Sequence, residues 1–157
     1  MALALRDPSL LDQEPKVSAD DFRNPAYREI FRKVVECRPF NCDDLIDRVR
    51  ESLTETLQDS LSQLLELHAQ HPVHFQEHLE SAYKSAAVNL LLRSLSLRMK
   101  ELEAMRFEAE PEEDPTETTD LVRIEQEIAK EIQRLYLLKG TLPLRAIHKE
   151  VRHGGRR

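Results

Sequence analysis

Residues 121–138 read LVRIEQEIAKEIQRLYLL, and this stretch decides the fold. Its apolar residues recur at intervals of three and four, the spacing that places side chains on one face of an α-helix. The seam contains Leu121, Ile124, Ile128, Ile132, Leu135 and Leu138. We expect a long helix that is capped by Thr119 or Asp120 and stops at Lys139-Gly140.

A second seam of the same kind lies upstream. No helix breaker occurs between Val73 and Glu108. The apolar residues of this segment follow a four–three spacing at Val88, Leu92, Leu95, Met99 and Leu102. Residues 108–120, EAEPEEDPTETTD, are acidic and contain two prolines, which is typical of an exposed loop. Two long helices joined by such a loop predict an antiparallel hairpin.

The first half of the chain predicts a bundle of about five short helices. The opening Ala2–Leu5 resembles the end of a helix and stops at Asp7-Pro8, so we expect the chain to belong to a longer protein. Asn24-Pro25 starts a further helix. The predicted fold is therefore all-α: a small helical bundle (residues 1–80), a long C-terminal helical hairpin (81–140) and a basic, flexible tail (141–157).

Composition excludes several classes of function. The chain has only three glycines, all after residue 139, so the glycine-rich turns of Rossmann, P-loop and nucleophile-elbow motifs are missing. A net charge of −6 argues against nucleic-acid binding by the whole chain. Two cysteines indicate a reduced, cytoplasmic setting, and no apolar run is long enough to cross a membrane. We expect no enzymatic activity and no cofactor.

Two groups of residues suggest other chemistry. The histidines are His68, His71, His74 and His78, and the last two could meet a metal from one helix face. Pro72 separates the two pairs, so a solvated helix junction, with no metal, is the favoured interpretation. Cys37 and Cys42 lack metal-site spacing and are interpreted as structural thiols.

The tail after residue 140 carries five Lys or Arg and could touch nucleic acid weakly. One alternative function is therefore a stand-alone nucleic-acid-binding or metal-binding helical protein that uses this tail and the histidines.

The hairpin has more apolar residues than two seams need, which is the usual mark of a partner site. The residues predicted to bind a partner are Met105, Phe107, Leu121, Ile124, Ile128, Leu135, Tyr136 and Leu138. In isolation, the chain is expected to be a monomer or a dimer that exchanges hairpins.

Residues 3–36, LALRDPSLLDQEPKVSADDFRNPAYREIFRKVVE, resemble the opening of the C-terminal helicase-binding domain of bacterial DnaG-type primases. The matching residues are the turn Arg6–Leu10 and the motif Asp21-Phe22, Pro25, Tyr27-Arg28 and Ile30-Phe31. The N-terminal domain of the DnaB-type helicase shares this fold and matches more loosely.

The resemblance implies a module without polymerase chemistry that binds the N-terminal collar of the hexameric DnaB-type helicase. The bundle would stimulate the helicase, and the hairpin, mainly through residues 120–139, would supply much of the binding. Family sequences diverge in the hairpin, so no hairpin residue here is matched to a family contact.

Overall fold

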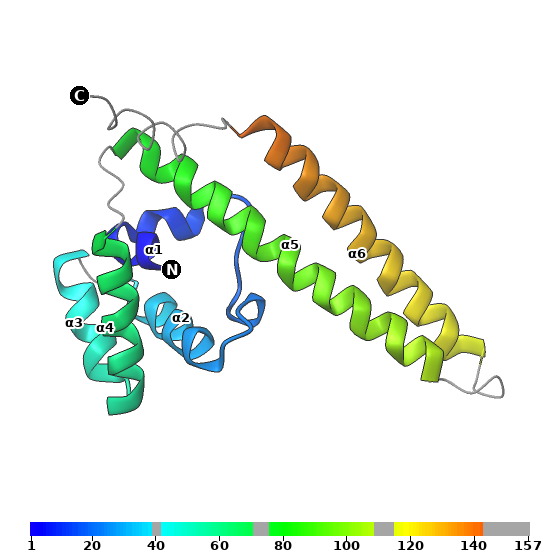
Figure 1. Cartoon of the computed structure of the whole chain (residues 1–157), viewed down its shortest axis with the longest axis horizontal. Coiled ribbons are helices and arrows are strands. Elements are labelled where there is room, and N and C mark those ends of the chain that lie inside the picture. Colours follow the sequence, from blue (N-terminus) through cyan, green and yellow to red (C-terminus); the bar gives the residue numbers. More distant parts are fainter. Residues whose placement is uncertain (39–41, 71–75, 109–114, 143–157) are drawn as a thin grey trace, which may run out of the picture.

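The computed structural model describes residues 1–38, 42–70, 76–108 and 115–142. Every regular element in these ranges is helical, which confirms the all-α prediction. The elements are α1 (Ala2–Arg6), the 3-10 helices η1 (Pro8–Asp12) and η2 (Ala19–Asp21), α2 (Pro25–Cys37), α3 (Cys42–Ser52), α4 (Glu55–Gln70), α5 (Gln76–Glu108) and α6 (Pro115–Thr141) (Figure 1).

Short polar side chains and prolines set the helix starts in the first part of the chain. Asp7 accepts a hydrogen bond from the Ser9 N–H at 3.1 Å, directly before η1. Asn24 accepts one from the Ala26 N–H at 2.9 Å, and α2 begins at Pro25, as predicted. Each cap satisfies a backbone donor that has no partner inside the helix, and proline is tolerated at that first position.

Helices α1 to α4 lie on one side of the first part of α5, which contacts α1 and η2 (Figure 1). Their core is apolar throughout and holds Ala4, Leu5, Leu10, Leu11, Ile30, Phe31, Val34, Leu45, Val49, Leu53, Leu61, Leu79, Tyr83 and Ala87. Three of these residues come from α5, so the long helix is part of the bundle as well as of the hairpin.

Helix α5 links the two parts without a break. At 33 residues it is about 50 Å long. The bundle core ends on it at Ala87, and the hairpin core begins at Val88. The change of packing partner therefore falls inside α5, a few residues beyond the boundary that was predicted at residue 80.

The second part is the expected antiparallel pair of α5 and α6 (Figure 1). Its buried cluster consists of Val88, Leu92 and Leu135. Partly buried residues pack around the cluster, namely Leu91, Leu95, Ile132, Leu138 and Leu142. Each helix buries one stripe, and the remaining circumference faces solvent.

Both predicted ends of the last helix are wrong. Helix α6 begins at Pro115 rather than at residue 119 or 120, because proline is well tolerated in a first helical turn and no breaker follows it. It also continues through Gly140 to Thr141. The Leu142 N–H donates to the Leu138 carbonyl at 3.2 Å, and Leu142 packs against the hairpin cluster. This packing offsets the roughly 1 kcal/mol by which glycine disfavours a helix.

Candidate partner-binding surface

Large apolar side chains that face solvent are concentrated on the hairpin. Nine such residues occur in the ranges that the structure describes: Val35, Leu67, Leu97, Met105, Phe107, Val122, Ile124, Tyr136 and Leu137. Only Val35 and Leu67 belong to the bundle, which leaves seven on α5 and α6. A concentration of this kind on a protruding element indicates a binding surface.

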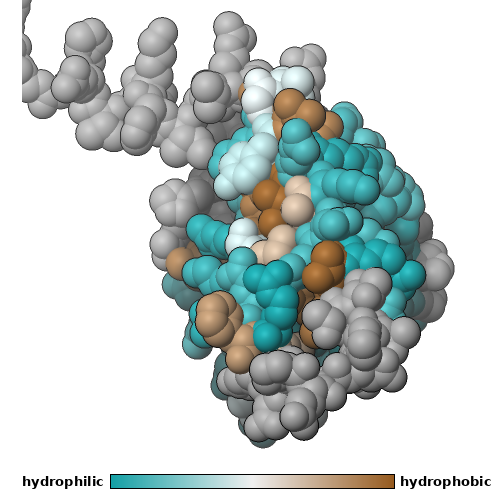
Figure 2. All heavy atoms as spheres, turned by 90° about the vertical axis from the view of Figure 1, so that its right-hand side faces the viewer, coloured by the Kyte–Doolittle hydropathy of each residue, from teal (hydrophilic) through white to brown (hydrophobic). Residues whose placement is uncertain are grey.

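One group of these residues lies near the tip of the hairpin. Phe107 is 90% exposed and Met105 57%, both in the last turn of α5. Val122 and Ile124 of α6 lie at the same end, since α6 runs back from the tip. Seen from this end, apolar residues form a broken band between hydrophilic flanks (Figure 2).

A second group lies toward the C-terminal end of α6. Tyr136 is 60% exposed and Leu137 69%. Beside them is a shallow, open depression of about 350 Å³. Its lining combines apolar and basic side chains: Lys130, Gln133, Arg134, Leu137, Leu138 and Thr141.

The structure divides the residues predicted to bind a partner. Met105, Phe107, Ile124 and Tyr136 are exposed. Leu121 and Leu138 are half-buried. Ile128 is 7% exposed and Leu135 fully buried, so in this arrangement both stabilise the hairpin and offer no surface to a partner.

Glu125 occupies the place in the seam that the sequence pattern assigned to Ile124, and it forms an ion pair there. The Arg106 guanidinium donates to the Glu125 carboxylate at 3.0 Å, and the Glu125 side chain is only 15% exposed. Ile124, expected in the seam, points outward and is 38% exposed. The sequence spacing is compatible with Glu125 in the seam, because Glu125 lies three residues before the buried Ile128.

The motif that carries the resemblance builds one corner of the bundle, where η2 meets α2. The Phe22 and Phe31 rings pack with centroids 5.0 Å apart. Arg28 donates to the Phe22 carbonyl at 3.2 Å, which ties α2 to the segment before it. The motif residues in this corner are thus accounted for by folding.

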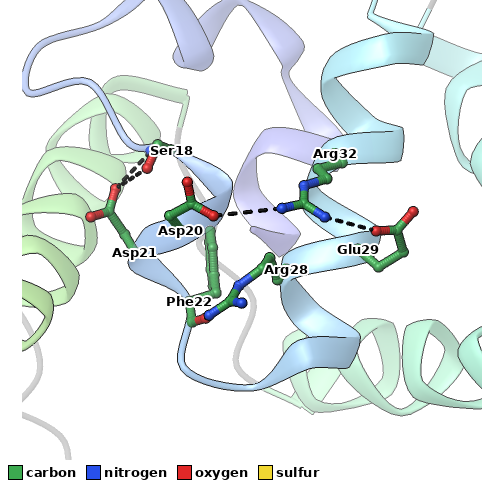
Figure 3. Close-up of polar contacts among 7 residues, drawn as sticks. All are labelled: Ser18, Asp20, Asp21, Phe22, Arg28, Glu29 and Arg32. Atoms are coloured by element: carbon green, nitrogen blue, oxygen red, sulfur yellow. Dashed lines mark hydrogen bonds and ion pairs between the residues drawn. The ribbon is translucent and has the colours of Figure 1, made fainter.

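Charged side chains on the surface of this corner extend the same links (Figure 3). The Ser18 N–H and hydroxyl both donate to Asp21, at 2.7 and 2.9 Å. The Arg32 guanidinium lies 3.5 Å from the Asp20 carboxylate and 3.3 Å from the Glu29 carboxylate. The contact with Asp20 links η2 to α2. These ion pairs are exposed, so each contributes at most about 1 kcal/mol.

Several predictions fall outside the residues that the structure describes. These concern His71, His74 and the tail from residue 143, together with the side chains of His68, His78 and Cys42. Cys37 is a free, half-buried thiol packed against the bundle core. Within the described ranges, no three His, Cys, Asp or Glu residues are grouped so that they could hold a metal ion.

Likewise, none of the helices in the described part of the chain combines the length and the apolar character that a membrane crossing requires.

The chain matches no protein-family model, no curated protein and no solved structure.

Proposed function

We propose that this chain is the helicase-binding domain of a bacterial DnaG-type primase. In this role it acts in the cytoplasm, carries no catalytic chemistry of its own, and tethers primer synthesis to the hexameric DnaB-type helicase at the replication fork. Its partner surface on the helicase is the N-terminal collar.

One observation carries the proposal: residues that resemble the primase family lie together in a single folded corner. Phe22, Arg28 and Phe31 contact one another or the same backbone segment there. The corner belongs to a small bundle followed by a long hairpin, which is the architecture that the resemblance implies. The motif residues therefore pack and hydrogen-bond within the bundle, as residues that define a fold would.

The distribution of exposed apolar residues supports a hairpin that docks and a bundle that is structurally complete. Apart from Val35 and Leu67, the bundle keeps its large apolar residues out of full exposure, whereas the hairpin presents side chains such as Phe107 and Leu137 to solvent. Aromatic and aliphatic residues of this kind are the anchors that dominate protein interfaces.

Mixing the full chain with a hexameric DnaB-type helicase from the same organism tests the proposal. We expect a complex on a sizing column, quantified by sedimentation velocity. Absence of any complex at low salt would contradict the proposal.

Two exposed leucines provide a matched pair of variants. Leu137 on the hairpin is 69% exposed and Leu67 on the bundle 58%. Leu137→Ser should weaken helicase binding by about tenfold, the effect of losing one apolar anchor, and Leu67→Ser should leave binding within about twofold of wild type. The opposite result would move the binding site to the bundle.

A further inference from the structure

The middle of α5 carries cations without carboxylates. Residues 81–100 include four Lys or Arg and no aspartate or glutamate, although the chain as a whole has a net charge of −6. Three of these cations, Arg93, Arg98 and Lys100, are exposed and form no ion pair with any residue that the structure describes. A local surplus of positive charge of this kind attracts an anionic partner.

Two of the three cations lie on a line of exposed side chains along α5, which we call the outer line. Its members repeat at intervals of four and three: Arg93, Leu97, Lys100, Ala104 and Phe107. This spacing keeps all five on one face of the helix, over a length of about 21 Å. Helix α6 packs on a different face of α5, the one that contains Val88 and Leu92. The outer line is therefore separate from the hairpin seam and from residues 120–139.

Carboxylates close to the outer line lie off it or already have partners. Glu101 and Glu103 follow Lys100 in the sequence, and the helical rotation places them on the two flanks of the line. Helix η2 contacts α5, but its two aspartates are engaged by Arg32 and by Ser18. The cations of the outer line therefore remain available to an anion from outside the chain.

The placing of these cations indicates a ligand that leaves them hydrated. Arg93 and Lys100 alternate with Leu97 and Ala104 along the line rather than flanking them. In a seam with a partner helix both cations would lose water, a cost that a buried ion pair often fails to repay. On a membrane surface, cations lie beside the apolar stripe and not within it. Phosphodiesters, in contrast, bind Lys and Arg at the surface, where the release of counterions drives association.

The apolar members of the line fit the bases and sugars of single-stranded DNA. Phe107 is 90% exposed, and an exposed aromatic ring is a platform on which an unpaired base stacks. Leu97, which is 41% exposed, and Ala104 offer no hydrogen-bonding group to a 2′-hydroxyl. A deoxyribose therefore loses less hydrogen bonding than a ribose when these side chains cover it.

We propose that the outer line of α5 binds a single strand of DNA, with phosphates at Arg93 and Lys100 and a base stacked on Phe107. This inference goes beyond the proposed function and does not depend on it, because it concerns another ligand and another helix. So few phosphate contacts predict weak binding, with a Kd on the order of 10⁻⁵ M at low salt.

Two double variants of the full chain, equal in net charge, test the site. Arg93→Gln/Lys100→Gln removes the cations of the outer line, and Lys130→Gln/Lys139→Gln removes two exposed lysines of α6. Glutamine is a good helix former, so both variants should keep the wild-type circular dichroism. Binding to a fluorescein-labelled deoxyuridine strand of about 12 nucleotides is measured by fluorescence anisotropy at several salt concentrations.

We expect the outer-line variant to bind the strand at least about fivefold more weakly than wild type. The slope of log K against log salt should become shallower by about 1.4, since each phosphate contact on a single strand contributes about 0.7. The α6 variant should stay within about twofold of wild type. Equal losses in the two variants, or no binding by wild type, would overturn the inference. Neither outcome bears on the helicase complex.

Phe107→Leu tests the base contact, because it keeps an apolar side chain and removes the aromatic ring. Affinity for the strand should fall about fivefold, whereas Tyr136→Leu, which removes an exposed ring from α6, should leave it unchanged. A uridine RNA of the same length should bind no more tightly than the deoxyuridine strand. Tighter binding of the RNA would overturn the choice of DNA. If Phe107→Leu binds like wild type and an oligoglutamate of equal charge displaces the strand completely, the outer line takes an acidic polypeptide and the inference fails.

Discussion

The bundle core draws fourteen buried residues from α1 through α5, whereas the hairpin cluster has three, from α5 and α6 alone. Several short helices that meet at different angles enclose a common interior. Two antiparallel helices enclose only the line along which they touch. Apolar residues beyond that line stay in solvent, as Phe107 and Leu137 do.

The bundle therefore holds most of the buried apolar residues, and the hairpin holds most of the large exposed ones. The two regions share α5, however, so they are not mechanically independent. Tyr83 and Ala87 belong to the bundle core, and the next residue, Val88, belongs to the hairpin cluster. Substitutions on either side of this point test how strongly the regions are coupled.

The largest effect is expected from Phe31→Ala in the bundle. Phe31 is 4% exposed and packs on Phe22, so its removal should lower the free energy of unfolding by about 3–5 kcal/mol. The measurement is urea denaturation followed by circular dichroism. Because α5 is shared, hairpin amides should also lose protection against hydrogen exchange.

The control for this variant is Val35→Ala, one turn along α2 and 46% exposed. It should change stability by no more than about 0.5 kcal/mol. If Phe31→Ala leaves the hairpin fully protected, the two regions fold independently despite the continuous helix.

Leu135→Ala should have a comparable but local effect. Leu135 is fully buried in the small hairpin cluster, and truncating a buried leucine costs about 2–5 kcal/mol. We expect faster hydrogen exchange throughout α6 and in the second half of α5, with bundle amides unchanged. Leu137→Ala, at an exposed position of the same helix, should leave exchange as in wild type. Loss of protection in α2 as well would show that the bundle depends on the hairpin.

Elements whose structure depends on near neighbours follow from the sequence pattern. Asn24 and Pro25 act on the first turn of α2 and predicted its start, and the three–four spacing predicted the long helices. The apolar pattern is misleading at Ile124, because an isoleucine looks more like a seam residue than Glu125 does. Glu125 is accommodated in the seam because Arg106, 19 residues away in the sequence, donates a hydrogen bond to its carboxylate.

Glu125→Leu tests whether the ion pair limits hairpin stability. One Glu125 carboxylate oxygen is buried without a hydrogen-bond partner, while Arg106 is 44% exposed and stays hydrated when left unpaired. Leucine would extend the apolar seam, so we expect stability to rise by about 1 kcal/mol. Glu127→Leu, on the exposed face, should have little effect. A loss of stability in Glu125→Leu would show that the pair contributes more than its burial costs.

The smallest expected effect is a pH dependence of bundle stability that arises from Tyr83. Burial raises the pKa of the Tyr83 phenol above its ordinary value, and Arg38 opposes this slightly. At lower pH the Tyr83 phenol is neutral in both the folded and the unfolded chain. Above about pH 10 the unfolded chain loses the proton first. The Tyr83 contribution to stability is therefore fully present below that pH and is lost as the pH rises through the folded-state pKa.

Urea midpoints measured across this alkaline range should fall less steeply for Tyr83→Phe than for wild type. Tyr136→Phe, which changes an exposed tyrosine of the hairpin, should keep the wild-type slope. If the two variants behave alike, the alkaline loss of stability arises from other titrating groups such as lysines rather than from the Tyr83 phenol. In that case burial of the Tyr83 phenol has no measurable consequence for the stability of the bundle.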